Sequence, residues 1–97
     1  MIIELHVPEG AVSNQVIFSL KEEVSSLSQI NKDIARAEIM LRYNPTALTD
    51  DKICEIKLVL VDDYLFVQKS NGRFVRSAIQ AVEDLKMQLL EKVKAPN

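Results

Sequence analysis

The chain has little of what most catalytic and extracellular proteins require. Its 97 residues include one cysteine, one histidine, two glycines and no tryptophan. A single cysteine cannot form an internal disulfide, which suits a reducing compartment, so we expect a cytoplasmic protein. Two glycines are too few for a glycine-rich phosphate-binding loop. Because aromatic residues make up only 5% of the chain, stacking platforms for single-stranded nucleic acid are also scarce.

Charge and hydropathy exclude further classes of protein. The formal net charge of −2 argues against indiscriminate binding to polyphosphate, although a local basic patch is compatible with it. No apolar run approaches the roughly 20 residues that cross a bilayer, and the N-terminus lacks the basic segment of a secretion signal. With 47% hydrophobic and 27% charged residues, the composition is typical of one globular domain over residues 1–97.

The apolar pattern predicts elements in the order β-α-β-β-β-α. Alternating residues indicate strands over 2–7, 34–43, 53–61 and 64–70, the last two joined by a tight turn at Asp62-Asp63. Ser13 or Asn14 should cap a first helix that ends between residues 28 and 31, and a second helix should follow over 73–92. Each helix has one buried apolar stripe. The stripes are Val16, Ile17, Leu20, Val24 and Leu27 in the first helix, and Phe74, Ala78, Ala81, Val82, Leu85 and Leu89 in the second.

This order predicts an α+β fold with a four-stranded mixed sheet and two helices packed on one face, similar to a double-stranded RNA-binding domain. A right-handed crossover places the first helix on one face of the sheet, and the second helix needs the same face to bury its stripe. The other face should be solvated and carry charges of alternating sign with weak cross-strand ion pairs. Its predicted residues are Glu4, His6, Arg36, Glu38, Arg42, Glu55, Lys57 and Lys69.

The sequence offers no catalytic group in a reactive setting. His6 lies in the first strand, where an enzyme would need a carboxylate such as Glu4 or Glu38 gathered with it in a pocket. Cys54 falls at an inward strand position among aliphatic residues, which favours a buried thiol over a nucleophile. No His/Cys cluster has the spacing of metal ligands. We therefore expect no enzyme activity, no metal site and no cofactor.

Phe18 is the one apolar residue that leaves two interpretations open. It lies about 100° from the direction of Ile17, at the margin of the first helix's apolar stripe. It is either wedged along the edge of that stripe or exposed as a contact point for a partner protein.

The segment EIKLVLVDDYLFVQKSNGRFVRSAIQAVEDLKMQLLEKVK resembles the ribosome hibernation promoting factor and ribosome-associated inhibitor A family, also called the sigma factor modulation protein family. The family pattern Ala-Val-x-x-Leu-x-x-Gln-Leu matches AVEDLKMQL, and ARAEIMLRYN matches the family's second strand. The chain is similar to a short form without the C-terminal dimerisation domain. The resemblance implies a cytoplasmic factor that binds the decoding region of the small ribosomal subunit, inhibits translation and promotes ribosome hibernation under stress.

The resemblance also implies where RNA would bind, because the family uses Lys and Arg on the outer faces of its two helices to neutralise phosphates. Basic residues remain here at Lys21, Arg73, Arg76, Lys86, Lys92 and Lys94. Other positions that are usually basic in the family hold Glu23, Ser26, Gln29, Asp84, Met87 and Glu91. The sequence thus leaves two functions open. One is binding of small-subunit rRNA through the helices, and the other is a diverged protein of the same fold that binds a protein partner, with Phe18 as the candidate contact.

Overall fold

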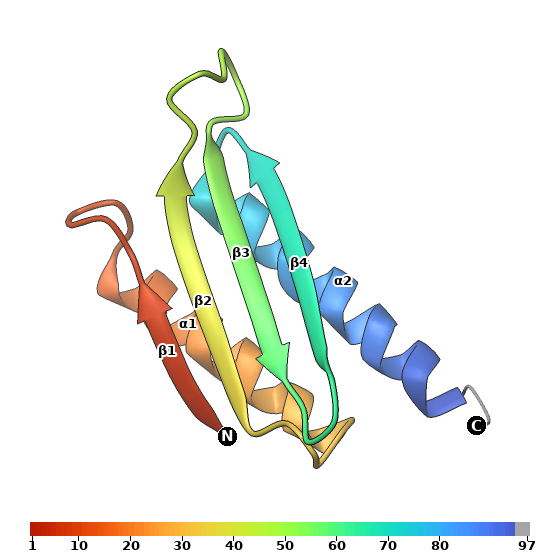
Figure 1. Ribbon diagram of the computed structural model, residues 1–97. Helices are drawn as coiled ribbons and strands as arrows, with labels where there is room; N and C mark the ends of the chain where they lie inside the picture. Colours follow the sequence, from red (N-terminus) through yellow and green to blue (C-terminus); the bar gives the residue numbers. More distant parts are fainter. Residues whose placement is uncertain (95–97) are drawn as a thin grey trace.

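The computed structural model describes the backbone of residues 1–94 and the side chains of residues 1–92. Two α-helices cover one face of a four-stranded sheet and lie behind it in the view of Figure 1. The elements are β1 (Ile2–His6), α1 (Asn14–Ser25), a short 3-10 helix η1 (Ser26–Gln29), β2 (Arg36–Tyr43), β3 (Lys52–Val59), β4 (Tyr64–Asn71) and α2 (Phe74–Lys94). The strands lie in the order β1-β2-β3-β4, with β1 parallel to β2 and the other pairs antiparallel. The predicted fold class and element order are confirmed.

Local hydrogen bonds explain where the helices begin. Gly10 adopts a φ of 73°, a left-handed conformation that glycine tolerates, in the turn before α1. The Ser13 side chain then caps α1 by accepting a hydrogen bond from the Val16 N–H at 3.2 Å, so Ser13 is the cap of the two residues predicted. At α2, the Asn71 side chain accepts a hydrogen bond from the N–H of Arg73 at 3.2 Å. Ser13 therefore satisfies a free backbone N–H at the start of α1, whereas Asn71 orders the turn that leads into α2.

The core lies between the sheet and the helices, and both predicted stripes supply it. Leu20, Val24 and Leu27 are buried from the α1 side, while Val16 and Ile17 lie half-buried at the stripe margins. Every predicted stripe residue of α2 is buried, including Leu85 and Leu89, which have no exposed surface. The sheet contributes fully buried side chains from its two central strands. These are Ala37, Ile39, Cys54, Ile56 and Leu58.

The connection between β3 and β4 differs from the predicted tight turn. The last pair of the ladder is Val59 with Tyr64, so four residues join the strands instead of the two at Asp62-Asp63. A two-residue hairpin needs left-handed conformations, which aspartate adopts less readily than glycine. No residue other than Gly10 has a positive φ in the described part of the chain. The longer connection closes with a hydrogen bond from the Leu60 N–H to the Asp63 carbonyl at 2.8 Å.

Lys69 was predicted on the face of the sheet away from the helices, and this is wrong. The register pairs Lys69 with Cys54, and directly paired residues of antiparallel strands share a face, so Lys69 lies on the helix side. Its Nζ is 3.3 Å from Oδ2 of Asp84 in α2. This ion pair links the edge strand β4 to α2, the helix that covers it.

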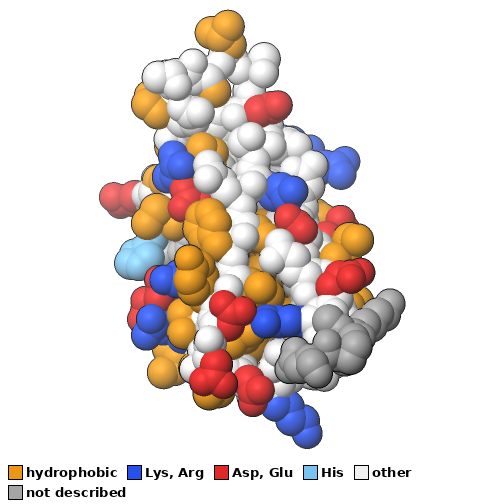
Figure 2. All heavy atoms as spheres, turned by 45° about the vertical axis from the view of Figure 1, so that its right-hand side comes forward, with side chains coloured by type: hydrophobic (Ala, Val, Ile, Leu, Met, Phe, Trp, Pro, Cys, Tyr) orange, Lys and Arg blue, Asp and Glu red, His pale blue; other side chains and the backbone are white. Residues whose placement is uncertain are grey.

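The face of the sheet away from the helices, here called the open face, is less polar than predicted. Arg42 does pair with Glu55 across β2 and β3, and Arg36 pairs with Glu38 along β2 at 2.8 Å. Exposed apolar side chains lie among these charges, as Figure 2 shows. They include Met40, Tyr64 and Phe66, which are 43%, 58% and 48% exposed.

Candidate functional site

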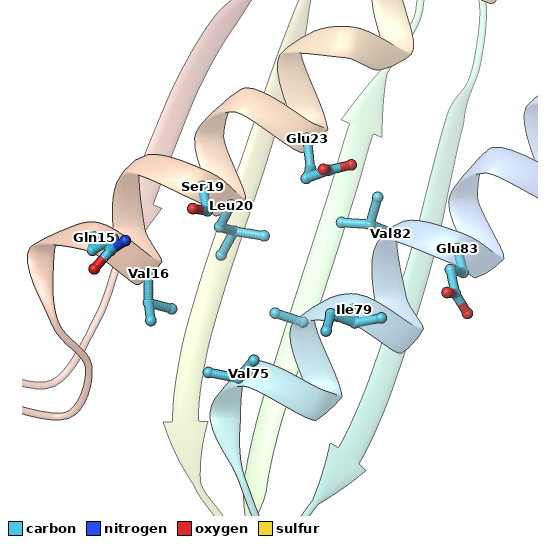
Figure 3. Close-up of a pocket in the computed structure, with 10 residues that line it drawn as sticks. Gln15, Val16, Ser19, Leu20, Glu23, Val75, Ile79, Val82 and Glu83 are labelled. Atoms are coloured by element: carbon cyan, nitrogen blue, oxygen red, sulfur yellow. The ribbon is translucent and has the colours of Figure 1, made fainter.

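The two helices form the surface to which the resemblance directs attention. Each follows a strand and runs back along the sheet, so α1 and α2 point in the same direction (Figure 1). We call their outer, solvent-facing surface the helix face. The two helices do not pack tightly against each other along their length. A groove of about 540 Å³ lies between them, shown in Figure 3.

The groove is apolar along its floor and walls and acidic at one end. Val16 and Leu20 of α1 face Val75, Ile79 and Val82 of α2 across it. Near the C-terminal end of α1 and the middle of α2, each helix contributes one carboxylate to the lining. These are Glu23 and Glu83. Ala78 completes the apolar part, and Gln15 and Ser19 add neutral polar groups.

The residues predicted to bind RNA lie along both helices and do not gather into one cluster. Lys21 is exposed on α1, and Arg73 and Arg76 are exposed at the start of α2. Lys86 is exposed further along α2, where a rise of about 1.5 Å per residue puts it roughly 20 Å from Arg73. The side chain of Lys94 lies outside the described residues. A phosphate-binding surface made of these residues would consist of separate contacts.

Lys92 already has a partner within the protein. Its Nζ is 3.1 Å from Oδ2 of Asp63, in the connection between β3 and β4. The pKa of Asp63 is lowered, first because its carboxylate accepts a hydrogen bond from the Tyr64 N–H and then because of Lys92. This exposed pair joins the end of α2 to the β3–β4 connection, so a carboxylate of the protein itself already accompanies the Lys92 charge.

The positions that depart from the family's basic pattern have different surroundings. Glu23, Ser26, Gln29 and Glu91 are exposed, and Met87 is 65% exposed. Asp84 is different because it is partly buried and paired with Lys69. The helix face therefore carries carboxylates and an exposed thioether among its basic residues.

Phe18 is 66% exposed, so it is not wedged along the edge of the apolar stripe. It lies on α1 but does not line the groove between the helices. Its role as a contact for a partner protein stays a prediction.

The side chains considered for catalysis, His6 and Cys54, do not line the groove between the helices. His6 is exposed in β1 on the open face, and it lines neither the groove nor a smaller hollow of about 380 Å³ near the β3–β4 connection. Cys54 has no exposed surface, and burial, with a smaller effect of the Glu55 charge, raises the pKa of its thiol to about 12. Among residues 1–92, no three His, Cys, Asp or Glu side chains come together as metal ligands could. In residues 1–94 no helix has the length and apolarity needed to traverse a membrane.

Sequence reasoning missed the groove between the helices. It assigned Val82 to the buried stripe but treated Val75 and Ile79 as neither core nor site. The spacing of Val75, Ile79 and Val82 does predict a second apolar edge on α2, next to the buried stripe. Only the structure shows that α1 lies opposite this edge.

Comparison with known proteins supports the fold but no closer relationship. No protein-family model and no curated protein sequence matches the chain. Among solved structures, the N-terminal domain of Thermus thermophilus Protein Y is similar, with 16% identity and a TM-score of 0.75 over 95% of this chain and 99% of that one. A ribosomal subunit interface protein from Coxiella burnetii has 15% identity and a TM-score of 0.78, over 98% of this chain and 100% of that one. The chain therefore has the fold of these two proteins, and the predicted resemblance is confirmed at the level of the fold.

Proposed function

We propose that this protein is a non-enzymatic, cytoplasmic factor that associates with the ribosome, binds small-subunit rRNA through the helix face and inhibits translation in hibernating ribosomes. The observation that supports this most is the match to the Coxiella burnetii ribosomal subunit interface protein over 98% of this chain and 100% of that one.

Charge on the helix face sets the expected strength of RNA binding. Lys92 is paired with Asp63, so among the side chains of residues 1–92 about four basic ones are available on α1, on α2 or directly before α2. These are Lys21, Arg73, Arg76 and Lys86. Four phosphate contacts give a slope of log K against log salt of about −3, so affinity should fall roughly 50- to 150-fold between 50 and 200 mM salt. We therefore expect ribosome association that is clear at low salt and lost near physiological salt.

Co-sedimentation with ribosomes tests the proposal. At about 50 mM salt, where electrostatic contacts are strong, the protein should pellet with ribosomes. Lys21→Gln with Lys86→Gln should weaken association and make the salt slope shallower by roughly 1.5 to 2. The matched control is Lys32→Gln with Lys57→Gln, which removes the same charge from residues outside both helices. If the protein stays in the supernatant at this salt concentration, the proposal is wrong.

The converse change adds charge to the helix face. Met87→Lys with Glu91→Lys should strengthen ribosome association, because both side chains are exposed and stand where the resembled family is basic. Asp84 is a poor choice for this experiment, since Asp84→Lys would break its ion pair with Lys69 and place two cations together. If neither the loss nor the gain of charge alters affinity for ribosomes, the helix face is not the contact surface.

A second candidate function is a diverged protein of the same fold that binds a protein partner. The exposure of Phe18 favours it, together with the carboxylates on the helix face. A partner recovered from lysate by the native protein should then be lost with Phe18→Ser while the circular dichroism spectrum stays native. Recovery of rRNA that is insensitive to Phe18→Ser would instead support the first function.

A further inference from the structure

The groove between α1 and α2 combines a buried floor with exposed walls. Leu20, Ala78 and Val82 form the floor and are between 5% and 8% exposed, so the two helices and the sheet already cover them. On the α2 wall, Val75 is 37% and Ile79 is 45% exposed. The walls therefore offer apolar surface that the protein itself does not cover.

The charged residues that line this groove have one sign, although exposed Lys86 follows one turn beyond Val82 on α2. Glu23 and Glu83 are its only charged lining residues, and both are exposed (Figure 3). Neither takes part in an ion pair with another side chain of residues 1–92. Phosphate groups are therefore disfavoured at this end of the groove, whereas cations there have one carboxylate on each helix to pair with, the Glu83 side chain pointing away from Glu23 (Figure 3).

We propose that the groove is a docking site for an amphipathic helix of a partner protein, with apolar anchors on one face and lysine or arginine beside them. A helix laid along a groove between two helices presents side chains at i, i+3, i+4 and i+7, which match apolar walls on both sides. Val75 and Glu83 are eight residues apart on α2, about 12 Å along its axis. The occupant therefore has room for roughly two turns, with apolar anchors over Val75 and Ile79 and its cations toward Glu23 and Glu83. This site is separate from Phe18 and does not require ribosome association.

Synthetic peptides test this occupant directly. The probe is a fluorescein-labelled helical peptide of roughly 16 residues, with Leu at i, i+3, i+4 and i+7 and Lys elsewhere. Two matched peptides have Glu in place of Lys, or Ser in place of Leu. Of the three peptides, only the Leu–Lys peptide should show saturable binding in fluorescence anisotropy. Equal binding of the Leu–Glu peptide would overturn the proposal, because the carboxylates would then contribute nothing.

Variants of the protein locate the binding. Glu23→Gln with Glu83→Gln should weaken the Leu–Lys peptide about 2- to 30-fold, the range for two exposed charge pairs. Ile79→Ser should weaken it about fivefold through lost apolar contact. Because the Ile79 side chain is half-exposed, the variant should stay folded, which circular dichroism checks. The matched control is Glu22→Gln with Glu91→Gln, which removes the same charge outside the groove and should change affinity less than twofold.

Two results would overturn the assignment of site or occupant. Loss of peptide binding in the control variant to the same extent would show that overall charge, and not the groove, attracts the peptide. A dimer in analytical ultracentrifugation that Ile79→Ser dissociates, without peptide binding, would show that a second copy covers the groove. The peptides contain no RNA and no ribosome, so failure here is distinct from failure of ribosome association.

Discussion

Leu85 is the residue whose truncation tests most directly how α2 is packed on the sheet. Its side chain has no exposed surface and belongs to the same buried cluster as Leu58 and Leu60. Leu→Ala removes about three methylene equivalents, worth roughly 2.4 kcal/mol in lost transfer free energy at about 0.8 each. A cavity that neighbours cannot fill adds to this, so the free energy of unfolding should fall by about 2–5 kcal/mol. That is a large part of the 5–15 kcal/mol typical of such a domain.

The assay is equilibrium urea unfolding followed by circular dichroism, with the slope held common to all variants. Leu90→Ala is the matched control, because it makes the same chemical change on the same helix where the side chain is 41% exposed. It should cost less than about 1 kcal/mol. A loss below ~1 kcal/mol for Leu85→Ala, or equal losses for the two variants, would show that the buried stripe of α2 is misassigned.

Two further predictions concern titrating groups. Because the Cys54 thiol has a pKa of about 12 instead of the usual 9.0, native protein should resist iodoacetamide at neutral pH, and unfolded protein should react. As pH rises, the thiol ionises in the unfolded protein before it does in the folded protein. The free energy of unfolding should therefore fall by up to about 1.4 kcal/mol per pH unit between pH 9 and 12. The Cys54→Ala variant should lack this pH-dependent loss. The Asp63 carboxylate has a lowered pKa, so the stability it contributes is present above its usual value of 3.8 and is lost as pH falls through the folded value. Lys92→Gln should raise the Asp63 pKa part of the way back in an NMR titration, because the Tyr64 N–H still holds the carboxylate.

The buried pattern is what made the fold predictable from sequence. Leu20, Val24 and Leu27 recur at helical spacing, and Cys54, Ile56 and Leu58 alternate as a strand requires. These periods depend on which side chains are buried, and the structure buries all six. Ser13 was predictable as a cap because its position before the helix is one where a hydroxyl oxygen satisfies a free N–H.

Features that depend on how elements meet could not be predicted in the same way. The length of the β3–β4 connection fixes which residues pair across it, and assigning Asp62 and Asp63 as the whole turn shortened it by two residues. Lys69 was misplaced because a long charged side chain suggests solvent, whereas its pairing with Cys54 turns it toward α2. The groove could not be predicted because the apolar spacing within α2 does not reveal that α1 lies opposite Val75 and Ile79.

The contrast between Leu85 and Lys92 explains why the fold and the proposed RNA contact have to be tested separately. A buried leucine specifies the packing of α2 whatever the helix face carries, so proteins with 15% or 16% identity can share the whole backbone arrangement. Affinity for phosphate depends instead on exposed cations that are free to change without disturbing that packing. Lys92 is a basic residue at the end of a helix, yet it cannot neutralise a phosphate without giving up Asp63. The number of unpaired cations on the helix face, and not the likeness of the fold, therefore determines the salt dependence that a ribosome-binding experiment should find.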